Sequence, residues 1–339
     1  MSDIFNIGGE PVFDDRIVKI ETHTYNPYAN TTFEHNDKIR IPIQQQDLYT
    51  LPYESFLYIE GKLTLNNQLK DLITVIMKNP GWDAQNNANE YFNFGVPLYM
   101  LLGFCEDYKR IVIKARRELI LIRSRNDNCL IGNLALEPVI NIFKIQWRMP
   151  RVISNKVNKL SMLRALESER YLSMGFRSWD MYEFSLLQRT IKHSWAIKTA
   201  IQLEKPRYVV FALQTGRKNV MSEETNRFDD CKLNNVKLYL NSECYPYDDM
   251  ILDFDKNRWS IPYDTYQRFC KNYYGYEYLE PSLTVTQFLR NGDQFVINCF
   301  RENKSVKSAT VDVRLEFECK ENVPMNTIAY CFTIHDRVI

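Results

Sequence analysis

Few side chains in this sequence are of the kinds that carry catalysis or bind transition metals. The 339 residues include four histidines, at positions 23, 35, 193 and 335, and eight scattered cysteines without a C-x-x-C pair. No two histidines stand four residues apart, which argues against a zinc site. The sequence also lacks the G-x-S-x-G, G-x-G-x-x-G and P-loop motifs of common enzymes. We therefore expect no catalytic residue, no bound metal or other cofactor, and no enzymatic activity.

Acidic residues gather in the second half of the chain, where their oxygens could bind a hard cation. They are Asp229, Asp230, Asp248, Asp249, Asp253 and Asp255. No glycine stands where an EF-hand loop needs one, so we expect solvated carboxylates in loops instead. In the first half, Glu106 and Asp107 stand close to Lys109 and Arg110. We interpret these four as a mixture of surface charges rather than as an acid–base pair.

Tyrosines crowd one region of the second half. They are Tyr245, Tyr247, Tyr263, Tyr266, Tyr273, Tyr274, Tyr276 and Tyr278. Such a group could stack on sugars or on nucleic-acid bases. Tyrosine is also enriched where protein subunits meet, so packing in the core or against another subunit is the favoured interpretation.

The composition indicates a β-rich globular chain with balanced charge. Aromatic residues make up 13% of it, with 21 Tyr and 19 Phe, and such residues favour the half-buried surface of a sheet. Lys and Arg number 43 against 42 Asp and Glu, so no basic excess marks a nucleic-acid-binding face. No apolar run is long enough to span a bilayer, and Met1 to Glu10 lacks the pattern of a secretory signal. We expect an intracellular chain, cytoplasmic or nuclear, whose cysteines are buried thiols.

The clearest structural pattern lies near the C-terminus. Apolar and charged residues alternate over Val311–Cys319, and after a break at Pro324 a second alternating run covers Ile328–Ile334. A period of two predicts strands with one buried face, and we expect these two strands to lie in one antiparallel sheet. His335 continues the polar side of the second strand, where a solvated side chain is expected rather than a catalytic one. The side chains expected inside are Val313, Leu315 and Phe317.

Alternating or fully apolar runs occur in both halves of the chain. They cover residues 39–43, 56–65, 143–149, 208–214 and 236–241. Residues 111–122 are apolar at both ends and charged in the middle, which suits two short strands or one long one. Helices are few: residues 155–173 with Ser154 as N-cap, residues 262–275 with Gly275 at the C-terminal cap, and a short one beginning within 96–102. Many strands with few helices between them indicate sandwiches. We place the boundary between domains 1–200 and 201–339 near residue 200, because the residues 204–206 (EKP) precede a new strand.

Ten stretches spread along the chain carry a resemblance to a known family. They are IPIQQQDLY (41–49), SFLYIEGKL (55–63), LLGFCEDY (101–108), KIQWRMP (144–150), FRSWD (176–180), KHSWA (192–196), LEKPRY (203–208), LYLNS (238–242), SATVDVR (308–314) and AYCFTIHDR (329–337). Together they resemble a widespread family abundant in insect genomes. That family is similar to the double jelly-roll major capsid proteins of Polinton (Maverick) elements and their relatives.

The resemblance implies an all-β fold of two jelly-roll β-sandwiches side by side, with a few short helices. It implies a structural major capsid protein of a virus-like or transposon-derived element, whose homotrimers tile an icosahedral shell. The partners would then be other capsid subunits and a minor capsid or penton protein. The protein would be located in the virion. No catalytic residue carries over. The alternative is a jelly-roll module that binds carbohydrate or a protein partner, because jelly rolls also serve as lectins.

One stretch departs from the family. Where relatives run through a strand–turn–strand segment, residues 66–80 are abridged in this chain. A sandwich that loses paired strands exposes apolar edges. We therefore expect the first sandwich, around residues 56–93, to be the less stable half.

Overall fold

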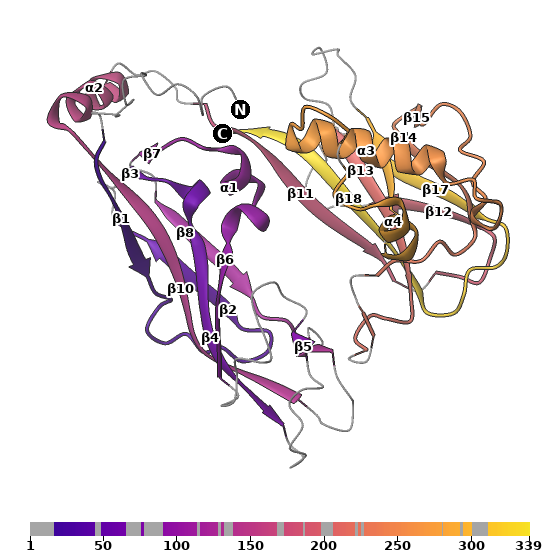
Figure 1. Ribbon diagram of the computed structural model, residues 1–339, viewed down its shortest axis with the longest axis horizontal. Helices are drawn as coiled ribbons and strands as arrows, with labels where there is room; N and C mark the ends of the chain where they lie inside the picture. Colours follow the sequence, from indigo (N-terminus) through magenta and orange to yellow (C-terminus); the bar gives the residue numbers. More distant parts are fainter. Residues whose placement is uncertain are drawn as a thin grey trace, which may run out of the picture.

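The computed structural model describes most of the chain, and Figure 1 shows how its elements are arranged. The described residues are 17–44, 49–65, 76–77, 91–113, 116–127, 130–131, 138–167, 173–185, 187–197, 206–220, 223–224, 227–279, 281–291, 294–299 and 311–339. They form two β-sandwiches side by side, with a few short helices. No helix within these residues is long and apolar enough to cross a membrane.

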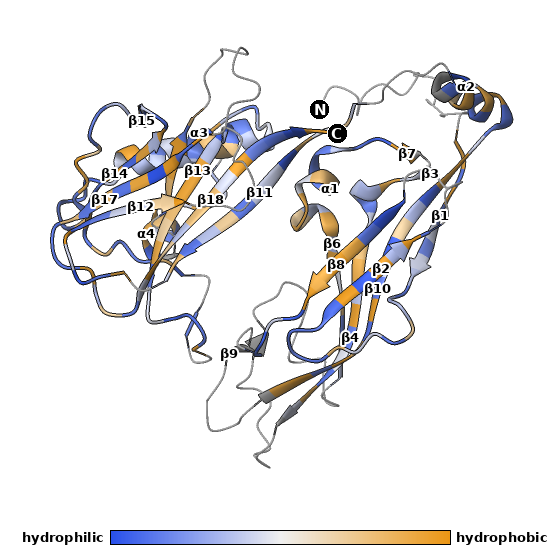
Figure 2. Ribbon diagram, turned by 180° about the vertical axis from the view of Figure 1, so that it is seen from behind, coloured by the Kyte–Doolittle hydropathy of each residue, from blue (hydrophilic) through white to orange (hydrophobic). Residues whose placement is uncertain are grey.

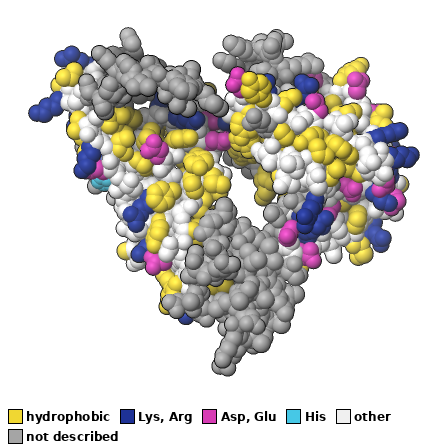
Figure 3. Space-filling model, in the orientation of Figure 1, with side chains coloured by type: hydrophobic (Ala, Val, Ile, Leu, Met, Phe, Trp, Pro, Cys, Tyr) yellow, Lys and Arg dark blue, Asp and Glu magenta, His cyan; other side chains and the backbone are white. Residues whose placement is uncertain are grey.

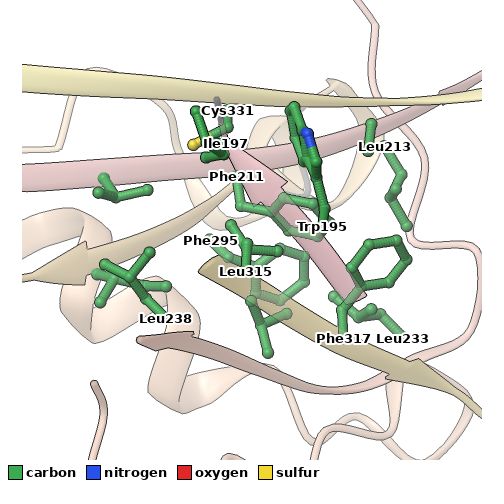
Figure 4. Packing of buried hydrophobic residues seen from close by; sticks show 14 of the residues in the cluster. Trp195, Ile197, Phe211, Leu213, Leu233, Leu238, Phe295, Leu315, Phe317 and Cys331 are labelled. Carbon is green, nitrogen blue, oxygen red and sulfur yellow. The ribbon is translucent and has the colours of Figure 1, made fainter. Parts of the chain in front are cut away.

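Two four-stranded antiparallel sheets face each other in the second sandwich. One holds, in spatial order, β11 (Gly175–Phe184), β18 (Thr327–Val338), β13 (Tyr208–Thr215) and β16 (Phe295–Asn298). The other holds β12 (Lys192–Ile197), β17 (Val313–Cys319), β14 (Leu233–Leu240) and β15 (Glu243–Tyr245). Figure 4 shows large side chains from both sheets, among them Trp195, Phe211 and Leu315, converging on one apolar core.

The first sandwich is built on one large sheet and one small one. β1 (Ile17–Tyr25) pairs with β10 (Pro138–Ser154), β10 pairs with β4 (Phe56–Leu65), and β4 pairs with β6 (Tyr91–Pro97). Two short strands, β3 (Tyr49–Thr50) and β7 (Val112–Ile113), extend this sheet beside β10. β2 (Lys38–Ile43) and β8 (Arg117–Ile122) form the smaller sheet, and β5 (Ile76–Met77) pairs with β9 (Leu130–Ile131). Ile41, Trp147 and Met149 lie in the core of this sandwich.

The two sandwiches repeat one plan of strands. The order β1-β10-β4-β6 in the first corresponds to β11-β18-β13-β16 in the second, and the pair β2-β8 corresponds to β12-β17. The corresponding strands also follow each other in the same order along the chain. Two antiparallel sheets that face each other, with strands that follow each other along the chain mostly lying in opposite sheets, form the jelly-roll architecture. The chain therefore holds two jelly rolls, which confirms the fold class predicted from the sequence.

Short helices lie around the sandwiches. They are α1 (Gly103–Asp107), α2 (Lys156–Glu167), α3 (Ser260–Tyr274) and α4 (Val285–Asn291), with 3-10 turns η1 (Pro52–Glu54), η4 (Leu98–Met100) and η6 (Phe254–Lys256). α3 buries Tyr266 and Phe269 against the outer side of the β11-β18-β13-β16 sheet. Gly275 ends this helix in the left-handed conformation, with φ 72°, as the sequence predicts. α2 begins after Asn155, whose side chain accepts the N–H of Asn158, so Asn155 is the cap rather than Ser154.

The alternation along β17 confirms which side chains are inside. Val313, Leu315 and Phe317 are buried, and Asp312 and Arg314 are exposed. Figure 2 shows the same alternation of hydrophobic and hydrophilic residues along other strands of both sandwiches. The side chains that a period of two assigns to one face are those that the sandwich buries.

The prediction that the last two strands share one sheet is wrong. β17 lies in the β12-β17-β14-β15 sheet, and β18 lies in the sheet that faces it. Two strands that face each other across a core show the same alternation as two neighbours, so the pattern cannot separate these cases. Residues 320–326 carry the chain from one sheet to the other.

His335 is buried, not solvated. Its exposed fraction is 2%, and its Nε2 lies 3.0 Å from Thr333 Oγ1 and 3.8 Å from Asp180 Oδ2. β18 is covered on both sides, because Cys331 faces the core between the sheets whereas Ile334 packs under α3. Because both faces of β18 are covered, the His335 side chain cannot be exposed to solvent on either face.

The boundary expected near residue 200 falls among the strands of the second sandwich. β11 and β12 both precede residue 200, yet they pair with β18 and β17. The abridged stretch at residues 66–80 lies outside the described residues, apart from β5.

Candidate functional site

A short helix joins the two sandwiches. α1 belongs to the first one, because Cys105 is buried in the core of that sandwich and Phe104 packs against the same core. The helix also touches β11, an edge strand of the second sandwich, where the Phe104 and Phe176 rings meet edge to face at 5.2 Å. In Figure 3 the two lobes meet in the upper part of the view and are separated by a gap below it. We call the contact between α1, β11 and the end of α3 the joint.

The approach at Gly103 leaves no room for a side chain. A Cβ atom built there would lie 1.8 Å from the carbonyl oxygen of Arg177 and 2.9 Å from its carbonyl carbon. Because these atoms belong to the backbone of a strand, no change of rotamer could make room. Glycine at position 103 therefore allows the backbone of α1 to touch the edge of β11.

Asp107 accepts several hydrogen bonds from Arg177. The backbone N–H of Arg177 donates to Oδ2 at 2.7 Å, its Nε donates to the same oxygen at 2.8 Å, and its Nη2 donates to Oδ1. β11 is the last strand of its sheet, so the carboxylate satisfies a backbone N–H on an edge. Both side chains are largely buried, and bonds between two charged groups are the strongest hydrogen bonds in proteins.

Tyr273, near the end of α3, completes the joint on the other side of Arg177. The guanidinium lies 3.7 Å from the centroid of the Tyr273 ring and donates to the Tyr273 carbonyl oxygen. The Tyr273 hydroxyl donates to Glu106 Oε2 at 2.6 Å and accepts from Trp179 Nε1 at 2.9 Å. Burial, together with the hydrogen bond to Glu106, raises the pKa of Tyr273 above its ordinary value, so the hydroxyl keeps its proton.

The charged groups of the joint bind one another across the two sandwiches. Burial alone would lower the pKa of Arg177, but its hydrogen bonds to Asp107 and the nearby charge of Glu106 outweigh that effect and raise it. The guanidinium therefore stays positive. Its donors are engaged by Asp107 and Tyr273. Such an arrangement can fix the angle between two domains.

Three of the six acidic residues singled out in the second half form ion pairs with basic neighbours. The pairs are Asp229 with Arg217, Asp249 with Lys237, and Asp253 with Lys320. A hollow of about 410 Å³ lies beside Asp229, and two other charged residues of its lining, Lys232 and Glu321, pair with each other at 2.7 Å. No group of three or more His, Cys, Asp or Glu residues suited to a metal ion occurs in the described part of the chain.

The tyrosines of the second half divide into two sets. Tyr263, Tyr266 and Tyr273 are buried where α3 packs on the sheet, in keeping with the favoured interpretation of a packing role. Tyr247 and Tyr278 are exposed.

The interpretation of Glu106 and Asp107 as surface charges is wrong. Both side chains are largely buried and bind groups of the second sandwich. Sequence reasoning missed Arg177 and Gly103 as well, since Arg177 and Asp107 are 70 residues apart in the chain. A signal was present, because the α1 and β11 residues of the joint lie within two of the stretches that carry the family resemblance, 101–108 and 176–180.

The repeated strand plan and the joint define a class of protein, in which one chain holds two jelly rolls in one orientation. A family model of a double jelly roll-like domain matches residues 54–339, and the chain belongs to this family. None of the curated proteins matches the sequence.

Three solved structures of viral capsid proteins are similar to this chain, and one of them has a TM-score above 0.5. The major capsid protein of mavirus is similar with a TM-score of 0.52 at 9% identity, over 98% of this chain and 90% of that chain. The major capsid protein of Faustovirus gives a TM-score of 0.46 at 8% identity, over 99% of this chain and 92% of that one. VP54 of PBCV-1, fitted into a reconstruction of the virophage Sputnik, gives 0.46 at 8% identity, over 97% and 96%. The likeness to the mavirus protein extends the double jelly-roll fold over nearly the whole chain.

Proposed function

We propose that this chain is a structural capsid protein whose trimers tile an icosahedral shell. One observation carries the proposal: a single chain repeats the jelly roll and locks the two copies together through Gly103, Asp107 and Arg177. A shell needs a subunit whose two halves keep one orientation, because the angle between them is passed on to every neighbour. The fold shared with the mavirus major capsid protein supports the same role.

The trimer is what the family resemblance implies, and the number of sandwiches is compatible with it. Three chains of two jelly rolls place six similar bodies around one axis, and a ring closes when every contact turns the next body by about the same angle. In such a ring of six jelly rolls, every second contact would be the joint, which lies within one chain. The remaining contacts would lie between chains, and contacts outside the ring would reach other trimers and a minor capsid or penton protein.

The origin and location of the protein belong to the same proposal. The ten stretches resemble a family that is itself similar to the capsid proteins of Polinton (Maverick) elements, and this supports an origin in such an element. The protein would then lie in the virion. A catalytic activity forms no part of the proposed role, since the charged groups of the joint bind one another.

We also place the division between the two jelly rolls between Glu167 and Gly175, rather than near residue 200. β10 is the last strand of the first strand plan, as β18 is of the second, and β11 opens the second plan. A cut at this division leaves each set of corresponding strands intact.

The experiment measures the mass of the purified chain by light scattering and then images it by negative-stain microscopy. The expected result is a species of three chain masses with a six-lobed outline, which goes on to closed shells at higher concentration. A protein that stays monomeric at every concentration at which it is soluble would contradict the proposal. A ligand-binding monomer or dimer of fixed size would favour the carbohydrate-binding alternative.

A further inference from the structure

β1 leaves apolar side chains in water at the edge of the first sandwich. Val18 is 65% exposed and Ile20 is 48% exposed, on a strand of nine residues. Among the described strands, β1 pairs with β10 alone. Within the described part of the chain, no backbone hydrogen bond outside that pairing involves residues 17–25. An edge strand with exposed apolar residues is a ready template for another chain.

The internal repeat shows what covers the corresponding strand of the second sandwich. β11 holds the place in the second strand plan that β1 holds in the first, at the edge beside β18 or β10. The edge of β11 is covered from outside its own sandwich: Gly103 abuts the Arg177 carbonyl, and Asp107 accepts the Arg177 N–H. The same position is therefore occupied by a neighbouring jelly roll in one case and exposed in the other.

The internal joint is a head-to-tail contact. The first sandwich presents the connection that follows β6, which contains α1, and the second presents its first strand, β11. Head-to-tail contacts leave one unused surface at each end of a chain, and repeating them closes a ring or extends a filament. Among the described residues, the unused surface at the front end is β1.

We propose that β1 is a contact surface between copies of this chain, on which the second sandwich of a neighbouring copy lies. The contact repeats between chains what the joint does within one, and it rests on the proposed assembly into trimers. Burial of Val18 and Ile20 at such a contact removes apolar surface from water. β1 also has a bulge between Ile17 and Lys19 and an exposed lysine, features that discourage indiscriminate pairing of an edge. Together they favour one shaped partner over general aggregation.

The test compares two double variants that exchange exposed apolar residues for glutamate. One is Val18→Glu with Ile20→Glu on β1. The matched control is Val157→Glu with Leu160→Glu on α2, where the exposed fractions are 77% and 52%. Circular dichroism and thermal unfolding check that each variant is folded, and light scattering gives its mass.

The expected result is that wild type and the α2 variant form trimers, while the β1 variant stays a folded monomer at concentrations at least tenfold above those at which wild type assembles. A folded β1 variant that trimerises like wild type overturns the inference and leaves the proposed capsid role standing. A wild type that never forms trimers overturns the proposed role and removes the basis of the inference.

Hydrogen exchange of the wild-type chain gives a second measurement that does not depend on folding of a variant. Amides of residues 17–25 are expected to exchange more slowly in the trimer than in dilute monomer, and amides of α2 are expected to change little. Equal exchange of β1 in monomer and trimer would overturn the inference.

Discussion

Replacing Gly103 with alanine tests whether α1 and β11 touch through their backbones. The new Cβ would lie 1.8 Å from the carbonyl oxygen of Arg177. Since non-bonded heavy atoms settle at roughly 3.5 Å, α1 must retreat by roughly 1.5 Å or β11 must bend away by as much. Neither movement is absorbed by a side chain, because both partners are backbone.

The retreat breaks the hydrogen bonds that follow Gly103 along the helix. The bonds from the Arg177 N–H and Nε to Asp107 are 2.7 and 2.8 Å long, and a shift of this size takes both beyond hydrogen-bonding range. Separating a fully buried ion pair costs about 3–5 kcal/mol. Since the side chains of Asp107 and Arg177 keep some exposure to water, the expected loss in the free energy of unfolding is about 2–4 kcal/mol.

Chemical denaturation, followed by fluorescence, measures this loss, with Gly175→Ala as the matched control. Gly175 begins β11, two residues before Arg177, and a Cβ built on it meets nothing within 4 Å. The control should therefore lie within about 1 kcal/mol of wild type. In Gly103→Ala the two sandwiches should also unfold in separate transitions, since the joint no longer couples them. If both variants unfold like wild type, the contact between the two backbones is not as close as the structure has it.

The remaining predictions concern the core, the thiols, one histidine and the abridged stretch. Leu315→Ala should lower the free energy of unfolding by about 2–5 kcal/mol in urea, because Leu315 is fully buried; a loss below about 1 kcal/mol would count against the core as described. Burial raises the pKa of Cys319 to about 12, so in the folded chain iodoacetamide should label the half-buried Cys244 well before it, as mass spectrometry of a digest would reveal. Burial lowers the pKa of His193, so this histidine binds a proton at higher pH in the unfolded chain than in the folded chain. The free energy of unfolding should therefore fall as the pH drops below 6.5, and His193→Gln should make that fall less steep. Limited proteolysis should cut first within residues 66–93 and leave a stable C-terminal fragment, whereas equal resistance of both halves would mean that the abridgement is compensated.

Local pattern was enough to predict which side chains of β17 are inside. The alternation at Val313, Leu315 and Phe317 depends only on the pleat of one strand, so it can be predicted without knowing the partner strands. The choice of sheet is different, since β17 and β18 would show the same alternation as neighbours or as facing strands. His335 illustrates the cost of this ambiguity, because it lies on the same face of β18 as Ala329 and Cys331, which the sandwich buries, while the opposite face packs under α3.

The joint could not be predicted by the same means. Glu106 and Asp107 on a short helix have the same spacing whether they face water or an arginine of another domain. What distinguishes the two cases is Arg177, whose position beside α1 is set by the path of the chain through both sandwiches. A glycine at the start of a helix is likewise unremarkable until the strand that abuts it is known.

The joint and β1 have opposite requirements, which explains their different chemistry. The joint forms once, within one chain, so it can use contacts without tolerance, such as a backbone touching a backbone at Gly103 and a buried arginine bound by a carboxylate. A contact between chains must form from separate partners that are folded and hydrated beforehand, and exposed apolar residues such as Val18 and Ile20 suit it because they lose little on desolvation. Weakening the joint should therefore alter the angle between sandwiches and yield irregular assemblies, whereas weakening β1 should yield well-folded monomers. Microscopy of Gly103→Ala beside the β1 variant separates the two outcomes, and shells of normal outline from Gly103→Ala would mean that the joint does not set the geometry of the subunit.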